Sequence, residues 1–166
     1  MNKLMNNLKL NLGVMFLAGL AASIAMAAEK PKEMGGWELG SLYNNFYKAS
    51  ELDSFRAEVV KVMEVVPMAG MAPGVALQVK ESGEETVEVQ VCPSWYIEPG
   101  NIGLKRGDQV KIRGVWAEIG GRDVFLASKI KKGDYFSLKV RLTKDGTPFW
   151  TMTPEQLARE KQNTED

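Results

Sequence analysis

The sequence contains no histidine and a single cysteine, Cys92, in 166 residues. Without histidine, the chain cannot build a Ser-His-Asp or Cys-His catalytic site, a histidine-ligated haem or an ordinary histidine zinc site. One cysteine excludes an internal disulfide, a c-type haem motif and a CxxC redox centre. We therefore expect a protein that is not an enzyme and that holds no cofactor. Cys92 itself is either a small buried hydrophobe or a free thiol open to pairing.

The chain also lacks an excess of charge of either sign, with 21 basic and 21 acidic residues. This balance does not by itself suggest a surface for polyanions. The length, with 45% hydrophobic and 25% charged residues, fits one globular domain at most.

Residues 1–28 have the three parts of a secretory signal peptide. Lys3 and Lys9 precede a short apolar run, Leu12 to Ile24, which ends at the cleavage pattern Ala25-Met26-Ala27. The run is shorter than the roughly 20 residues that a spanning helix needs. We therefore predict cleavage after Ala27 or Ala28, a periplasmic protein, and no membrane span in the mature chain.

Residues 29–52 are predicted to form a flexible leader, residues 29–36, followed by a short amphipathic helix. From Trp37 onward, large apolar residues fall three and four positions apart, at Leu39, Leu42, Tyr43, Phe46 and Tyr47. That spacing places them on one helical face. Tyr43, Phe46 and Tyr47 either form a docking stripe for a partner or pack on their own domain.

Residues 53–150 have the alternation of half-buried β-strands. The expected strands are Phe55 to Val66, Gly74 to Lys80, Glu85 to Val91, Gln109 to Ala117, Arg122 to Lys129 and Tyr135 to Thr143. An irregular or helical connection, Pro93 to Gly107, separates the third strand from the fourth. Residues 151–166 are predicted to form a short helix and a charged tail, with Thr153 as N-cap and Gln156 completing a capping box.

Three meandering strands, an irregular connection and two or three further strands follow the order of an OB-fold, a small Greek-key barrel. The segment from Gly107 to Gly114, GDQVKIRG, looks like the opening of the strand after the OB-fold helix. In that motif the second glycine lets the strand bend sharply. With the secretion signal, the chain resembles the secreted bacterial OB-fold proteins, a group that includes periplasmic stress- and magnetosome-associated members. The resemblance implies a mainly β barrel of five to six strands with short terminal helices.

The second and third strands argue against nucleic acid as the ligand. OB-folds that bind single strands use a basic groove with aromatic rings on this exposed face. Here the face has no aromatic residue and is net acidic, consisting of Gln78, Lys80, Glu84, Thr86, Glu88 and Gln90.

Candidate binding residues lie in the loops at the barrel ends, where such folds usually place recognition. Trp95 and Tyr96 offer rings with polar handles, although Trp95 is also placed to plug the barrel. Arg122 ends the loop that starts at Glu118. Trp116 shares the register of Ile112 and Gly114 and is expected in the core.

The leading hypothesis is a non-enzymatic periplasmic module that binds a protein partner or a small ligand. An alternative is an accessory subunit of a redox or metal-handling system, in which Met68 and Met71 of the loop PMAGMAP touch a soft metal such as Cu(I). Gap-filling by these methionines is the simpler interpretation. A third hypothesis, oligonucleotide or oligosaccharide binding, follows from the fold analogy and is weakened by the acidic strand face.

Overall fold

The computed structural model describes residues 33–83 and 85–162. The predicted signal peptide, residues 29–32 of the predicted leader, Glu84 and the end of the charged tail lie outside the described residues. The α-helices are α1 (Leu42–Asn45) and α2 (Pro154–Gln162). The strands are β1 (Asp53–Val65), β2 (Gly74–Lys80), β3 (Thr86–Pro93), β4 (Gln109–Ile119), β5 (Arg122–Lys132) and β6 (Phe136–Lys139). Short 3₁₀ turns, η1 to η3, cover Ala49–Glu51, Pro99–Asn101 and Phe149–Thr151.

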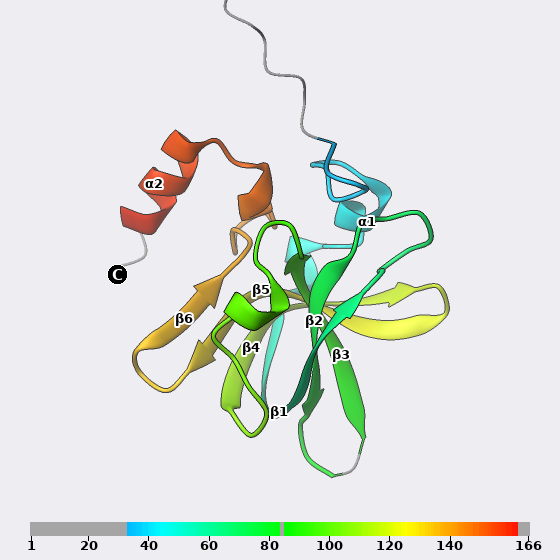
Figure 1. The fold of residues 1–166 in the computed structure, drawn as a ribbon, viewed down its shortest axis with the longest axis vertical. Coiled ribbons are helices and arrows are strands. Elements are labelled where there is room, and N and C mark those ends of the chain that lie inside the picture. The colour runs from blue at the N-terminus through cyan, green and yellow to red at the C-terminus, as the bar shows by residue number, and fades with distance from the viewer. Residues whose placement is uncertain (1–32, 84, 163–166) are drawn as a thin grey trace, which may run out of the picture. The chain divides into compact units, whose positions relative to one another are not determined.

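The strands form one six-stranded sheet in the order β3-β2-β1-β4-β5-β6. A parallel pairing of β3 with β5, through Val89 with Phe125 and Gln90 with Leu126, nearly closes the first five strands into a ring. The other neighbours are antiparallel. This mainly β, OB-like topology confirms the predicted fold class (Figure 1).

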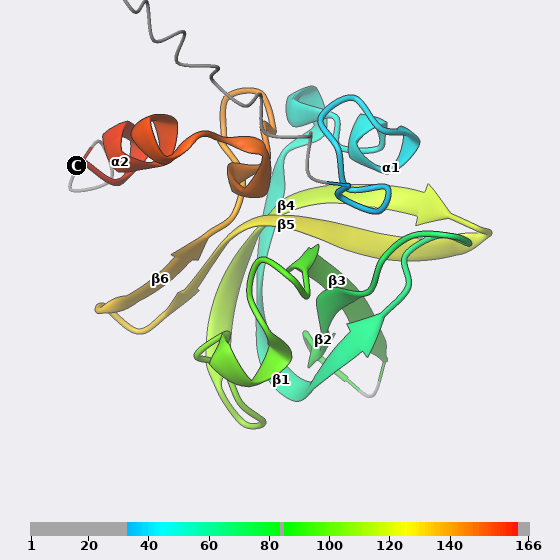
Figure 2. The same cartoon turned by 45° about the horizontal axis from the view of Figure 1, so that its top comes forward.

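Two long strands make the closure because each pairs with more than one strand: β1 with β2 and β4, and β5 with β3, β4 and β6. Asp53 to Glu58 of β1 pair with β4, and Glu58 to Val65 pair with β2, with a register shift between Val59 and Lys61. β5 pairs with β3 in its first half and with β6 in its second half. Figure 2 shows β4 and β5 running side by side, with β6 and the end of β5 projecting away from the barrel.

Gln90, predicted on the exposed strand face, is buried at 1% exposure, and Trp116, predicted in the core, is not buried. Gly114 explains the position of Trp116. The register between β4 and β5 shifts between Arg113 and Gly114, so the alternation of inward and outward side chains reverses there. Val115 therefore points into the core, and Trp116 is 40% exposed instead of buried. Its ring stacks on Phe55, with centroids 5.9 Å apart.

The N-terminal segment packs into the same core as the barrel. Trp37, Tyr43 and Tyr47 are buried in one cluster with the inward residues of the strands. The described residues accordingly belong to one compact unit. The helix is shorter than the apolar spacing predicts. Gly40 has a φ of +78°, which is not a helical conformation, so α1 begins only after the Ser41 cap.

The C-terminal part agrees with the local sequence signals but has less strand than expected. β6 ends at Lys139, because the amides of Val140 and Arg141 turn back to the Ser128 carbonyl at 2.9 and 3.3 Å. α2 begins at Pro154, directly after the predicted cap Thr153, and buries no residue. No helix among the described residues is long and apolar enough to cross a membrane.

Candidate binding site at the Trp95 end of the barrel

Five aromatic side chains from three segments meet at one end of the barrel. Ring centroids are 4.7 Å apart for Trp37 and Tyr43, 5.6 Å for Trp37 and Trp150, 6.2 Å for Tyr96 and Trp150, and 6.4 Å for Trp95 and Tyr96. We call these five residues the aromatic cluster. The Trp150 indole donates to the Trp37 carbonyl at 2.9 Å, and the Trp37 indole donates to the Ala72 carbonyl at 2.9 Å. The cluster thus ties the N-terminal segment to the loop 66–73 and to η3.

The predicted docking stripe divides between the core and the surface. Tyr43 and Tyr47 are only 2% and 7% exposed, so they pack on their own domain. Phe46 is half-buried against the core. The exposed apolar residues of this segment are Leu39 and Leu42. The sequence spacing predicts them on the same helical face as Tyr43 and Tyr47.

Arg141 is a buried cation in this region that the sequence analysis did not single out. Its guanidinium lies 5.0 Å from the Tyr47 ring centroid and 4.8 Å from that of Trp150, and it donates to the Gly146 carbonyl at 3.2 Å. Burial lowers the pKa of Arg141 and raises that of the neighbouring Tyr43 hydroxyl. In the sequence, Arg141 stands between Val140 and Leu142 and looks like an ordinary outward strand residue.

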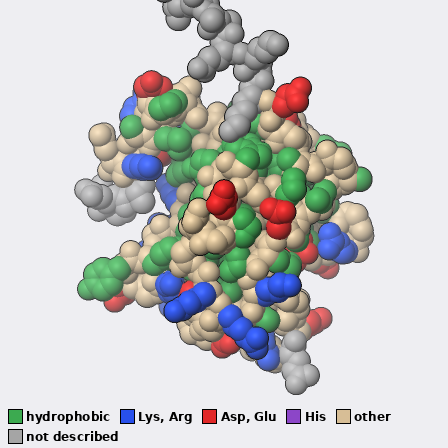
Figure 3. Space-filling model, viewed as in Figure 1, with side chains coloured by type: hydrophobic (Ala, Val, Ile, Leu, Met, Phe, Trp, Pro, Cys, Tyr) green, Lys and Arg blue, Asp and Glu red, His purple; other side chains and the backbone are tan. Residues whose placement is uncertain are grey.

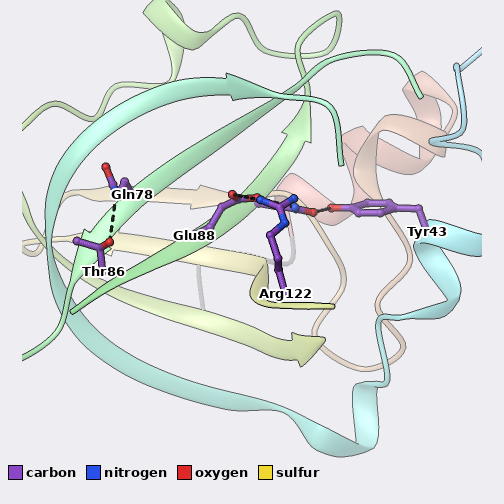
Figure 4. Close-up of polar contacts among 6 residues, drawn as sticks. Tyr43, Gln78, Thr86, Glu88 and Arg122 are labelled. Atoms are coloured by element: carbon purple, nitrogen blue, oxygen red, sulfur yellow. Dashed lines mark hydrogen bonds and ion pairs between the residues drawn. The ribbon is translucent and has the colours of Figure 1, made fainter. Parts of the chain in front are cut away.

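Arg122, the predicted loop residue, is engaged within the domain. It forms an ion pair with Glu88 at 3.3 Å, and Glu88 accepts a hydrogen bond from Gln90 at 2.8 Å. Gln90 in turn accepts from the Tyr43 hydroxyl at 2.9 Å. Figure 4 shows this network running across β3 toward α1, with Gln78 and Thr86 hydrogen-bonded farther along the same face. The polar residues of β2 and β3 are therefore linked mainly to one another.

Trp95 lies at an open depression of about 550 Å³ beside the aromatic cluster. Glu64 from the end of β1 and Glu98 from the loop after β3 line it together with Trp95, Pro73 and Ser94. The two glutamates are exposed, and Trp95 is half-buried with its indole N–H directed to the Met34 carbonyl at 3.4 Å. The Ser94 hydroxyl is buried without a hydrogen-bond partner among the described residues.

The depression combines a flat ring with negative charge. Carboxylates attract cations, and a tryptophan face does so as well. Figure 3 shows hydrophobic side chains across the upper part of the near face, with acidic side chains among them. Sequence reasoning selected Trp95 but not Glu64 and Glu98. Glu98 lies in the same loop as Trp95, and only the fold brings Glu64 to them from the end of β1.

The hydrophobic core accommodates Met68, Met71 and Cys92. Both methionines pack, partly buried, against the hydrophobic core, and a Cβ at Gly36 would lie 2.7 Å from Met71 Cγ. Cys92 is fully buried, and that burial raises the pKa of its thiol to about 12. Within residues 33–83 and 85–162, no group of three or more Cys, Asp or Glu side chains is arranged to hold a metal ion.

The topology and this loop-built depression define an OB-like barrel with an open depression at one end. The model of the MamS/MamX magnetosome protein family matches residues 51–137, more than half of the chain. The protein therefore belongs to the MamS/MamX magnetosome protein family.

Other comparisons are distant. A chain of a replication protein A heterotrimer bound to single-stranded DNA matches with a TM-score of 0.37 and 17% identity, covering 51% of this chain and 60% of that chain. At this distance the match says nothing about the ligand of the present protein. No curated protein matches the chain significantly.

Proposed function

We propose that this protein is a non-catalytic, periplasmic accessory module of the magnetosome family that binds a basic segment of a protein partner in the Trp95 depression. The observation that carries the proposal is the placement of Glu64 and Glu98 around the half-buried ring of Trp95.

The chemistry of the depression favours a Lys or Arg side chain flanked by apolar residues. A guanidinium or ammonium over the Trp95 face gains a cation–π interaction of about 0.5–1 kcal/mol at an exposed site. The two carboxylates add charge attraction, and Pro73 supplies apolar surface beside the ring. Held in place by the aromatic cluster, the ring needs little reorganisation before it binds.

The test is a titration of the full chain with short peptides, followed through the indole N–H resonance of Trp95 in a nitrogen-15 NMR spectrum. We expect a peptide with Arg between apolar residues to shift this resonance, and the matching Glu peptide to leave it unchanged. The Trp95→Phe variant assigns the resonance. Replacing both carboxylates, Glu64→Gln with Glu98→Gln, should weaken binding at least about tenfold.

The matched control removes two exposed carboxylates elsewhere, Glu81→Gln with Glu118→Gln, and should bind normally. Equal shifts with the Arg and Glu peptides, or equal losses in the two double variants, would show that the depression does not select basic segments.

A further inference from the structure

Six basic side chains gather on one outer face of the sheet. This basic face consists of Arg56 in β1, Lys111 and Arg113 in β4, Lys129 and Lys131 in β5, and Lys139 in β6. Four of them are exposed, and Lys129 and Lys139 are half-buried.

The strand register arranges these cations in two rows. In one row Arg113 faces Lys129, which faces Lys139, and in the other Arg56 faces Lys111, which faces Lys131. Directly paired residues point to the same side of a sheet. Neighbours within a row are therefore about 4.8 Å apart at the backbone, and the rows are about 6.7 Å apart.

The charge of the basic face is largely uncompensated. Among the described residues, none of the six cations is in an ion pair, whereas the nearby Lys132 pairs with Asp108 at 3.0 Å. Lys139 lies 5.6 Å from the Phe149 ring centroid. The acids at the margin are Glu58, which accepts from Gln109, and Asp134.

The crowding has an energetic cost. Partial burial, followed by the positive charges of Lys131, Lys139 and Arg113, lowers the pKa of Lys129. Like charges directly opposite each other destabilise a sheet. An anionic surface placed against the basic face would offset this repulsion among the cations, so the same arrangement favours binding to such a surface.

The hollows of the basic face suit anionic headgroups. One depression of about 230 Å³ is lined by Ser54 and four of the cations, and an adjoining one of about 240 Å³ by Arg56, Lys111 and Lys131 among others. No aromatic ring lines either depression, so the stacking platform that single-stranded nucleic acid requires is missing from them.

An exposed aromatic residue stands at the edge of this face. Tyr135, at the tip of the β5–β6 hairpin, is 102% exposed. The hairpin projects from the barrel in Figure 2, and Phe136 anchors it so closely that a Cβ at Gly103 would lie 2.7 Å from its ring. Tyrosine is enriched where proteins meet the headgroup region of a membrane, because its ring is apolar and its hydroxyl stays hydrated.

We propose that the basic face and the Tyr135 hairpin tip form a docking surface for a membrane rich in anionic phospholipids. The cations contact the phosphate groups, and Tyr135 enters the interface. This surface is separate from the Trp95 depression, so the proposal does not rest on the proposed function.

The test places a polarity-sensitive dye at the hairpin tip of the full chain through Tyr135→Cys. Labelling is selective because the native Cys92 is fully buried. We expect a blue shift with phosphatidylglycerol vesicles, none with phosphatidylcholine vesicles, and reversal of the shift at high salt. Membrane contact through another part of the chain leaves the dye at position 135 in water and does not shift its emission.

Charge removal distinguishes the basic face from general attraction. Because each cation near an anionic surface contributes about fivefold to binding, Lys129→Gln with Lys131→Gln should raise the half-maximal lipid concentration at least about tenfold. The matched control, Lys61→Gln with Lys105→Gln, removes two lysines that line a different depression and should change it less than about threefold. Circular dichroism checks that both variants are folded.

Three results would overturn the proposal. They are an equal shift with phosphatidylcholine vesicles, equal losses in the two double variants, and a Lys129- and Lys131-dependent response to single-stranded DNA at lower concentration than to lipid. The last would identify nucleic acid as the ligand of the basic face.

Discussion

At the residue scale, Gly114 decides which side chains of β4 enter the barrel. A Cβ there would lie 2.0 Å from the Leu126 carbonyl oxygen and 2.8 Å from Phe125 Cε1. Since backbone cannot yield as a flexible side chain can, Gly114→Ala should lower the free energy of unfolding by at least about 2 kcal/mol. Urea denaturation measures this loss. Gly100→Ala is the control, because a Cβ there would have no atom within 4 Å apart from its chain neighbours. Its free energy of unfolding should stay within about 0.5 kcal/mol of the parent value.

Asp108, at the turn before β4, gives the stability a pH dependence. Burial alone would raise its pKa, but the Lys105 amide and the Lys132 ammonium outweigh that effect and lower it below the ordinary 3.8. The carboxylate therefore stabilises the fold above the unfolded pKa, and this contribution is lost as the pH falls through the lower folded value. Asp108→Asn should be less stable at pH 7 by under about 1 kcal/mol. Denaturation at several pH values should show this difference shrinking toward about pH 2, and a constant difference would contradict the assignment.

At the scale of elements, α2 depends on its cap because it buries no residue. The Thr153 amide donates to Gln156 Oε1 at 2.8 Å, and the Gln156 amide donates to Thr153 Oγ1 at 3.3 Å. Thr153→Ala should destabilise the helix by about 1 kcal/mol. Hydrogen exchange in α2 should then accelerate about fivefold with no change in the melting temperature of the barrel. Unchanged or slower hydrogen exchange in α2 would contradict the role of the cap. Ser137→Ala, in β6, is the control and should leave the exchange in α2 unchanged.

At the scale of the whole domain, Trp37 joins the N-terminal segment to the barrel. It is fully buried, and a Cβ at Gly74 would lie 2.3 Å from its ring. Trp37→Ala should therefore cost about 3–5 kcal/mol in thermal or urea unfolding. Trp116→Ala, which removes the same side chain from a half-exposed position, should cost clearly less. The reverse order would mean that the N-terminal segment is dispensable for the barrel.

Much of the fold was predictable because its signals are local. The alternation of Val75, Leu77 and Val79 depends only on the two-residue period of a strand, and β2 has the predicted bounds. The capping box of α2 likewise needs only residues within one turn. Trp116 could not be placed in this way, since the bulge that turns it outward depends on the close approach of β5 at Gly114.

The candidate sites were predictable only in part. Trp95 stood out as an aromatic residue near a proline, and Glu98 follows it in the same loop, but Glu64 reaches both from the end of β1. The rows of the basic face exist only after β1, β4, β5 and β6 have paired, and in the sequence these cations look like scattered solvated charges.

The sequence by itself determined which segments form strands, the OB-like class and the helix cap, because periodicity, turns and capping act between near neighbours in the chain. The tertiary structure alone decided that Arg141 is buried between two rings, that Trp116 is exposed, and that acids and cations gather on separate surfaces. These outcomes depend on register and on contacts between residues far apart in the sequence, and no local pattern carries that information.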